Sequence, residues 1–200
     1  MTLTEVFKAY QTPDRHYHNL DHITGSLQLL AEVSDDIFEP FLVEKAIIFH
    51  DKRYNIKAAP HVNEIDSASD AEIWYRETFH LPERNPFDPP NPVLMRLERL
   101  ILVTAHDPLW MPPLTSDEKY MADIDLAGLG SSPEEFAKNS NNVRLEYMDY
   151  SDEDYRQGRI KFLSGMLKRD SIYYTDVFKA RCEAQARKNI TAELLKFLNL

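Results

Sequence analysis

Cysteine and glycine are both scarce in this sequence of 200 residues. The single cysteine, Cys182, cannot form a disulfide within the chain and cannot build a cysteine-based zinc site. Any metal ion must therefore be held by histidine and carboxylate side chains. Only five glycines are present, and apolar residues recur at the helical spacing of about 3.6 residues, with no convincing alternation of the strand type. The sequence predicts an all-α fold.

Long hydrophobic runs and an excess of positive charge are also missing. No apolar run approaches the ~18 residues of a membrane-spanning helix, and the N-terminal residues lack the basic-then-apolar character of a signal peptide. We therefore expect a cytoplasmic protein with no membrane partner. The 33 Asp and Glu residues outnumber the 23 Lys and Arg residues, giving a net charge of -10, which argues against binding to a nucleic-acid polymer. The net charge does not exclude a small anionic substrate that binds where basic residues converge.

Length and proline distribution favour one domain over residues 1–200. A hydrophobic content of 43% is enough for one core in a chain of this length. The proline-rich stretch from Leu81 to Pro92 is the nearest approach to an internal boundary, but it is too short to separate domains. The sequence is also compatible with an oligomer.

Apolar periodicity, capping residues and prolines mark the helix starts. Helices are predicted to begin near Leu3, Ile23, Pro40, Val62, Pro92, Ser116, Pro133, Asp152 and Asp176. The last of them is expected to continue to Leu198.

The helix predicted over the stretch before Asp51 ends on two ionisable side chains. Ala46 to Phe49 form an apolar run that should be buried, and His50 and Asp51 follow it directly. Unpaired ionisable groups are costly inside a protein, so this pair indicates either a hydrogen-bond network or a metal ion. For the pair taken alone, a satisfied core histidine with a capping aspartate is the simpler interpretation.

Further imidazole and acid groups lie at comparable places in the predicted helices. His18 and His22 are four residues apart on one helical face, a spacing that suits metal ligation. A polar helix start with exposed histidines is the alternative. His106 again ends an apolar helix, and Asp123 and Asp125 lie within a mostly apolar stretch, so at least one of these acids should be buried.

The order His22, then His50-Asp51, then Asp125 on a helical core resembles the HD superfamily of metal-dependent phosphohydrolases. More motifs resemble a small bacterial-type branch of predicted HD phosphohydrolases, over most of the chain. They are Arg15-x-Tyr17-His18-Asn19-x-x-His22, Phe49-His50-Asp51-x-x-Tyr54, Asn63-Glu64-x-x-Ser67-Ala68, Thr104-x-His106, Asp123-x-Asp125-Leu126-x-x-Leu129-Gly130, Arg144-x-Glu146-Tyr147, Gly158-Arg159 and Ala186-Arg187-x-Asn189.

The resemblance implies an HD-domain-like helical bundle in which His22, His50, Asp51 and Asp125 hold one divalent metal ion. Imidazoles and carboxylates suit Mn, Fe, Co, Ni, Zn or Mg, and the ligand set alone does not choose among them. Asp123 and Asp125 are two residues apart and cannot point the same way on a regular helix. Asp125 is preferred because Asp125-Leu126-Ala127 resembles the Asp-Leu-Ser run that carries the final ligand in related cyclic-nucleotide phosphodiesterases. Asp123 is then a supporting neighbour of the ligand.

Other polar residues are candidates for substrate binding and catalysis. The candidate substrate-binding residues are Arg15, His18, Arg144 and Arg159, because guanidinium groups match phosphate with paired donors. Each arginine taken alone is more often a surface residue. The candidate catalytic residues are Asp51, Glu64 and His106. Glu64 otherwise caps its helix, and His18 and His106 are also candidates to hold a ligand in place, carry a proton or bind a second ion.

These features lead to the hypothesis of a cytoplasmic phosphohydrolase that acts on a small phosphorylated compound, with a nucleotide as first choice. No glycine-rich phosphate loop is present, so the nucleotide rests on the resemblance alone. A metal- and ligand-binding regulatory module without useful turnover is the main alternative. Two further alternatives remain. One is a structural helical bundle with a buried polar network, and the other is an HD enzyme of different chemistry, such as metal-dependent oxygenation.

Overall fold

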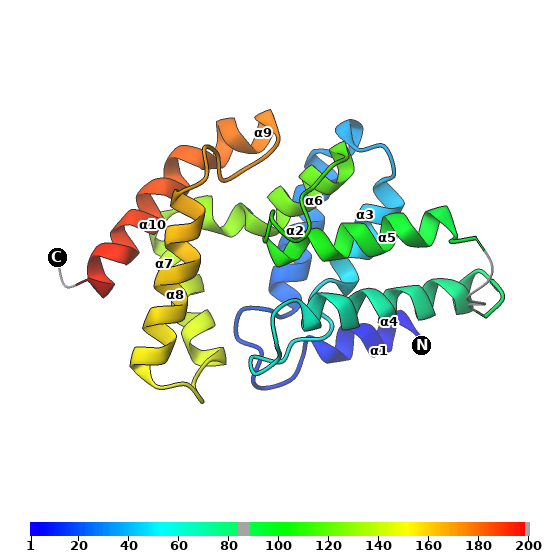
Figure 1. Cartoon of the computed structure of the whole chain (residues 1–200), viewed down its shortest axis with the longest axis horizontal. Helices are drawn as coiled ribbons and strands as arrows, with labels where there is room; N and C mark the ends of the chain where they lie inside the picture. The colour runs from blue at the N-terminus through cyan, green and yellow to red at the C-terminus, as the bar shows by residue number, and fades with distance from the viewer. Residues whose placement is uncertain (84–88, 199–200) are drawn as a thin grey trace. The chain divides into compact units, whose positions relative to one another are not determined.

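A computed structural model describes residues 1–83 and 89–198, and every regular element in those residues is helical (Figure 1). The predicted all-α fold is therefore confirmed. No helix within the described part of the chain combines the length and apolar character that crossing a membrane requires. Residues 84–88 of the loop predicted between Leu81 and Pro92 lie outside the described residues.

The chain forms two compact units, Met1–Ala122 and Asp123–Leu200. Helix α6 (Ser116–Leu126) begins in the first unit and ends in the second. The single domain expected over residues 1–200 stays a prediction.

The first unit is built around α3, whose apolar residues form its core. Its helices are α1 (Leu3–Ala9), α2 (Leu20–Glu32), η1 (Ser34–Asp36), α3 (Pro40–Phe49), α4 (Val62–Thr78), α5 (Pro92–Leu102), η2 (Val103–Ala105) and the start of α6. Helix α3 packs against α1, α2, α4 and α5, and α4 runs alongside α5 (Figure 1). Because α3 has neighbours all round, its residues from Ala46 to Phe49 are almost completely buried, and the helix delivers its C-terminal end to the interior.

The N-terminal end of α3 is fixed by a side chain from α6. Glu39 precedes the helix but gives it no side-chain cap, and Pro40 supplies no N–H. Asp117 instead accepts hydrogen bonds from the backbone N–H groups of Phe38 and Glu39, each at 2.8 Å. A carboxylate distant in sequence thus holds the two residues that lead into α3.

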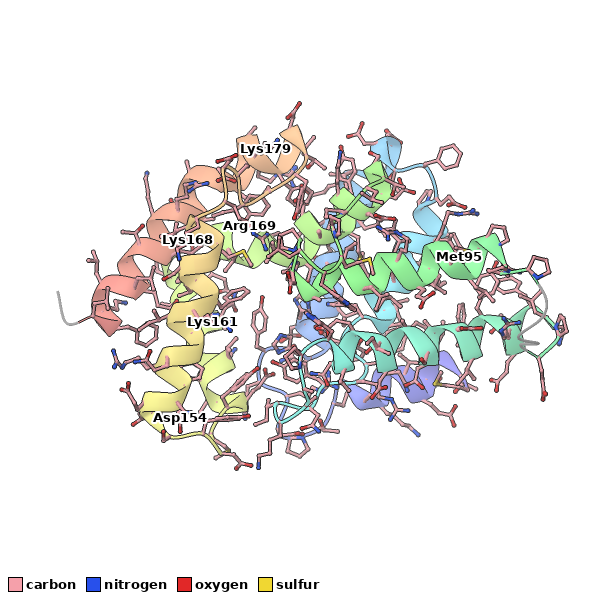
Figure 2. All side chains as sticks on the ribbon, in the orientation of Figure 1. Met95, Asp154, Lys161, Lys168, Arg169 and Lys179 are labelled. Atoms are coloured by element: carbon pink, nitrogen blue, oxygen red, sulfur yellow. The ribbon has the colours of Figure 1, made fainter. Side chains whose placement is uncertain are left out.

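The second unit contains the helices that follow α6. They are η3 (Ala127–Gly130), α7 (Pro133–Glu146), α8 (Asp152–Leu167), α9 (Asp176–Phe178), the π-helical segment η4 (Lys179–Glu183) and α10 (Ala184–Phe197). Helix α10 packs against α8, η3 and η4. Figure 2 shows the side chains, with Asp154 and Lys161 labelled on α8.

A close backbone approach explains one glycine of the second unit. A Cβ atom at Gly130 would lie only 2.6 Å from the Cβ atom of Cys182, so no larger residue fits there without a shift. Cys182 lies in η4, where the helix predicted as one piece from Asp176 to Leu198 changes its winding. The π-helical turn had no sequence signal, because neither proline nor glycine occurs between residues 176 and 198.

The ion pair between Arg99 and the buried Glu118, next to Asp117, makes the stability of the first unit depend on pH. Glu118 is only 3% exposed, and its carboxylate accepts from Arg99 Nε and NH2, each at 2.8 Å, and from the backbone N–H of Leu114 at 2.7 Å. Burial alone would raise the pKa of the Glu118 carboxyl. The hydrogen bonds from Arg99 and Leu114 outweigh burial and hold that pKa below its ordinary value of 4.5.

The substitution Glu118→Gln should therefore weaken the first unit in a pH-dependent way. Because the folded-state pKa is the lower one, the contribution of Glu118 is complete above its unfolded pKa and is lost as the pH falls through its folded pKa. At about pH 7 the substitution should cost about 1.5–3 kcal/mol of unfolding free energy. Urea unfolding as a function of pH should show a flatter acid limb for Glu118→Gln than for wild type.

Glu77→Gln is the matched control, because Glu77 is an exposed glutamate of the same unit that pairs with the N-terminal ammonium. It should leave the urea midpoint nearly unchanged. Equal acid slopes for wild type and Glu118→Gln would contradict the assignment.

Candidate metal centre

His50 lies at the C-terminal end of α3 with a ring orientation that is set by the helix itself. The residue is 2% exposed, and its Nδ1 atom lies 2.9 Å from the carbonyl oxygen of Ile47. A carbonyl oxygen can only accept, so Nδ1 carries a hydrogen, and in the neutral imidazole Nε2 then presents its lone pair. The helix end therefore fixes both the orientation and the tautomer of a potential metal ligand.

Three ligand atoms form a small triangle at this helix end. The Nε2 atom of His50 lies 3.0 Å from Oδ2 of Asp51 and 3.2 Å from Nε2 of His22. The third side, from His22 Nε2 to Asp51 Oδ2, measures 3.6 Å. With metal–ligand distances of ~2.1 Å, neighbouring ligands lie about 3.0 Å apart in an octahedral shell and about 3.4 Å apart in a tetrahedral one. The triangle fits one divalent ion in either geometry.

Helix α2 brings His22 to this triangle through its first turn. Asn19 is the N-cap of α2, and its side-chain oxygen accepts from the backbone N–H groups of Asp21 and His22. His22 therefore lies on a capped, regular helix start, which limits its freedom to move away.

Asp125, on the last turn of α6, completes a group of four. One ligand atom each from His22, His50, Asp51 and Asp125 lies within 4.8 Å of the others. This buried to half-buried His/Asp group could hold a metal ion, and it is the group that the sequence order and the HD resemblance suggest. Nitrogen and carboxylate ligands of this kind suit the borderline and hard divalent ions expected from the sequence.

Asp123 has a different role in the structure. It is fully buried, and its carboxylate accepts from the backbone N–H groups of Tyr174 and Thr175 at 2.8 and 2.7 Å and from the Thr175 hydroxyl at 2.7 Å. These bonds tie the segment before α9 to α6 within the second unit. Among the described residues, the group that could hold a metal ion contains Asp125 and does not contain Asp123, and Asp125 as the ligand stays a prediction.

The segment that follows Asp51 is anchored to α4. Ser67, on α4, accepts a hydrogen bond from the backbone N–H of Arg53 at 3.0 Å, and the side chains of Lys52 and Arg53 both pair with Asp70. Burial would raise the pKa of the Asp70 carboxyl, but its hydrogen bonds from Arg53 and Lys52 outweigh burial and lower it. Asp70 is therefore an ionised anchor for the residues next to the ligand Asp51.

The other candidate residues of the first unit lie at helix ends or beside aromatic rings. Glu64 is half-buried on the first turn of α4, and His106 is half-buried after η2 with a left-handed backbone (φ 53°). The ring of His18 stacks on Tyr54 with centroids 4.0 Å apart and meets Tyr17 edge-on. The roles of Glu64, His106 and His18 stay predictions.

The three candidate phosphate-binding arginines all contact other groups of the protein. Arg15 donates to backbone carbonyl oxygens of the first unit. In the second unit, Arg144 donates to Asp152 at 2.6 Å, and Arg159 pairs with Glu193 at 3.0 Å, with both side chains of that pair largely buried. Their proposed contact with phosphate stays a prediction.

Tyr10 and Asn19 bind backbone groups beside the candidate ligands, and the sequence analysis assigned no function to either residue. Tyr10 is 1% exposed and donates its hydroxyl hydrogen to the carbonyl oxygen of Ile48 at 2.8 Å. Asn19 caps the helix of His22, and an Asn directly before a helix is a recognisable signal. The Tyr10 bond spans 38 residues and has no local signal in the sequence.

Comparison with protein-family models, curated proteins and solved structures finds no match to this chain. Membership of the HD superfamily therefore stays a proposal, which rests on the sequence motifs and on the four grouped side chains.

We predict that the purified protein binds about one divalent ion per chain and that His50→Ala or Asp51→Ala abolishes the binding, because each variant removes one corner of the ligand triangle. Elemental analysis after desalting measures this directly. His80→Asn is the control, since His80 is an exposed histidine with a left-handed backbone that Asn tolerates. Full metal occupancy in both alanine variants would refute the ligand assignment.

The two aspartates of α6 should respond in opposite ways to the same change. Asp125→Asn should lose most of the bound metal and keep the fold. Asp123→Asn should keep the metal but lower the unfolding free energy by about 1–3 kcal/mol, because an amide NH2 would face backbone N–H donors. Metal content and urea unfolding of both variants test this, and metal loss in Asp123→Asn alone would reverse the assignment.

Proposed function

We propose that the protein is a metal-dependent phosphohydrolase that acts on a small phosphorylated compound, with a nucleotide as the first candidate. The observation that carries the proposal is the ligand triangle of His22, His50 and Asp51 at the end of a buried helix, together with Asp125. Placing two imidazoles and two carboxylates in one small space is costly unless a cation joins them.

The residues of the group have chemical properties that suit this reaction. When bound, a divalent ion lowers the pKa of a coordinated water and neutralises charge on a phosphoryl group. His50 is oriented as a ligand, because its Nδ1 atom donates to the carbonyl oxygen of Ile47 and its Nε2 atom faces the other ligand atoms. Four protein ligands leave room in an octahedral shell for a water and a phosphate oxygen.

Proton transfer needs at least one further group. Glu64 and His106 are the candidates, because a carboxylate can accept a proton from water and an imidazole can donate one to a leaving oxygen. Each lies half-buried in the first unit, where it is neither fully solvated nor sealed off.

The class of substrate rests on charge and on the resemblance. A net charge of -10 disfavours a polyanionic polymer and leaves a small phosphorylated molecule as the better fit. The choice of a nucleotide within that class comes from the HD resemblance alone.

A regulatory module that binds metal and ligand without turnover is the second candidate. The observation in its favour is that Arg15 and Arg159 already have protein partners, so the donors that catalysis requires for phosphate must come from other residues or from rearrangement.

Turnover separates the two functions. We expect at least one compound from a panel of phosphomonoesters, cyclic nucleotides and nucleoside di- and triphosphates, each tested with Mn, Fe, Co, Ni, Zn and Mg, to be hydrolysed by wild type and not by His50→Ala. Release of inorganic phosphate or of nucleoside products measures the reaction.

His80→Asn should retain wild-type turnover in the same assay, which controls for handling of the variants. The regulatory module replaces the enzyme if no compound is hydrolysed above the His50→Ala level while one of them binds tightly only with metal present.

A further inference from the structure

We propose that Arg15 is a positioning residue for the metal ligands rather than a phosphate-binding residue. Its guanidinium group holds the backbone that carries Asp51, and through that backbone it sets the spacing of the ligand atoms. This inference rests on the metal centre of the proposed function, but it does not require that the protein hydrolyse any substrate.

The guanidinium group of Arg15 donates three hydrogen bonds to backbone oxygens near the candidate ligands. Its NH1 atom donates to the carbonyl oxygen of His18 at 3.0 Å and to that of Asp51 at 2.6 Å. Its NH2 atom donates to the carbonyl oxygen of Lys52 at 2.9 Å. One planar group thus joins the segment that leads into the helix of His22 to the residues at and after Asp51.

Aromatic rings fix the plane of this guanidinium. Its central carbon lies 5.2 Å from the ring centroid of Tyr10 and 5.5 Å from that of Tyr54. Tyr54 in turn stacks on His18, whose carbonyl oxygen Arg15 binds. Cation–π contacts on two rings leave the edge of the guanidinium directed at the three carbonyl oxygens.

The end of α3 depends on donors of this kind. The last carbonyl groups of a helix have no partner within the helix. Here the carbonyl oxygen of Ile47 accepts from His50 Nδ1, that of Ile48 accepts from Tyr10, and those of Asp51 and Lys52 accept from Arg15. Side chains thus hold four carbonyl groups in the last turn of α3 and directly after it.

Rotation of that turn would move the Asp51 carboxylate relative to the imidazole nitrogens. The Asp51 Oδ2 atom lies 3.0 Å and 3.6 Å from His50 and His22 Nε2, and metal–ligand distances tolerate departures of only ~0.2 Å. A loss of the Arg15 bonds should therefore lower metal affinity before any substrate is present. A phosphate-binding arginine would instead leave metal affinity unchanged and raise KM.

Arg15→Lys tests the two roles. Lysine keeps the charge between the tyrosine rings but cannot bind three carbonyl oxygens with one planar fork. Co2+ affinity of the metal-free protein, measured by competition with a chromophoric chelator and without substrate, should fall about 10–100-fold, as for other groups that orient metal ligands. Tyr10→Phe, which removes the hydroxyl group that donates to Ile48 and keeps the ring, should weaken Co2+ binding in the same direction.

Arg76→Lys is the matched control. Like Arg15, Arg76 donates to a backbone carbonyl oxygen of the first unit, that of Pro82, and it additionally pairs with the carboxylate of Glu72. It should keep the wild-type Kd for Co2+. An equal loss of affinity in Arg76→Lys would overturn the inference by showing general destabilisation, and so would an unchanged Kd with a raised KM in Arg15→Lys.

The experiment also separates this inference from the proposed function. Wild-type protein that binds Co2+ but hydrolyses nothing would end the phosphohydrolase proposal, while the difference in Kd between Arg15→Lys and Arg76→Lys would still support the positioning role.

Discussion

The candidate site depends on one constraint. Two imidazole nitrogens and a carboxylate oxygen lie close together at the end of a buried helix. The Nε2 atoms of His22 and His50 lie 3.2 Å apart, and both lie near Oδ2 of Asp51. His50 donates its Nδ1 hydrogen to the carbonyl oxygen of Ile47, so in the neutral imidazole its Nε2 atom offers a lone pair. A single hydrogen can join two of these atoms, whereas a divalent cation can bind all of them. This difference favours a metal ion over a hydrogen-bond network.

Helix α3 can present this triangle because remote side chains hold both of its ends. Asp117 accepts from the backbone N–H groups before its first turn, and Tyr10 and Arg15 donate to carbonyl oxygens at its last turn. The helix itself is apolar and surrounded, so its position follows from packing, while its end geometry follows from these few polar contacts. Substitutions far from the ligand atoms can therefore change the centre without touching it.

Local patterns in the sequence were sufficient for most helix starts, and the order of the motifs selected four side chains that lie close enough to hold a metal ion. Helices begin as expected at Pro40, Val62, Pro92, Pro133 and Asp152, where proline or a capping residue marks the first turn. The contacts that position the ligands were not predictable, since the bonds from Tyr10 to Ile48 and from Arg15 to Asp51 span 38 and 36 residues. A guanidinium group binds phosphate and carbonyl oxygens with the same donors, so the sequence alone does not show which of the two Arg15 binds. The π-helical turn at Cys182 likewise depends on packing rather than on a local pattern.

X-ray absorption at the metal edge of the Co2+-loaded protein is the most direct test of the central claim, because it reports the ligand atoms without any assumption about the reaction. For the wild type, the account predicts a shell of nitrogen and oxygen atoms at about 2.0–2.2 Å with the outer-shell scattering of two imidazole rings. In a His22→Ala variant that still binds Co2+, the scattering of one imidazole ring should remain. An all-oxygen shell without imidazole scattering in the wild type would contradict the assignment of His22 and His50 as ligands.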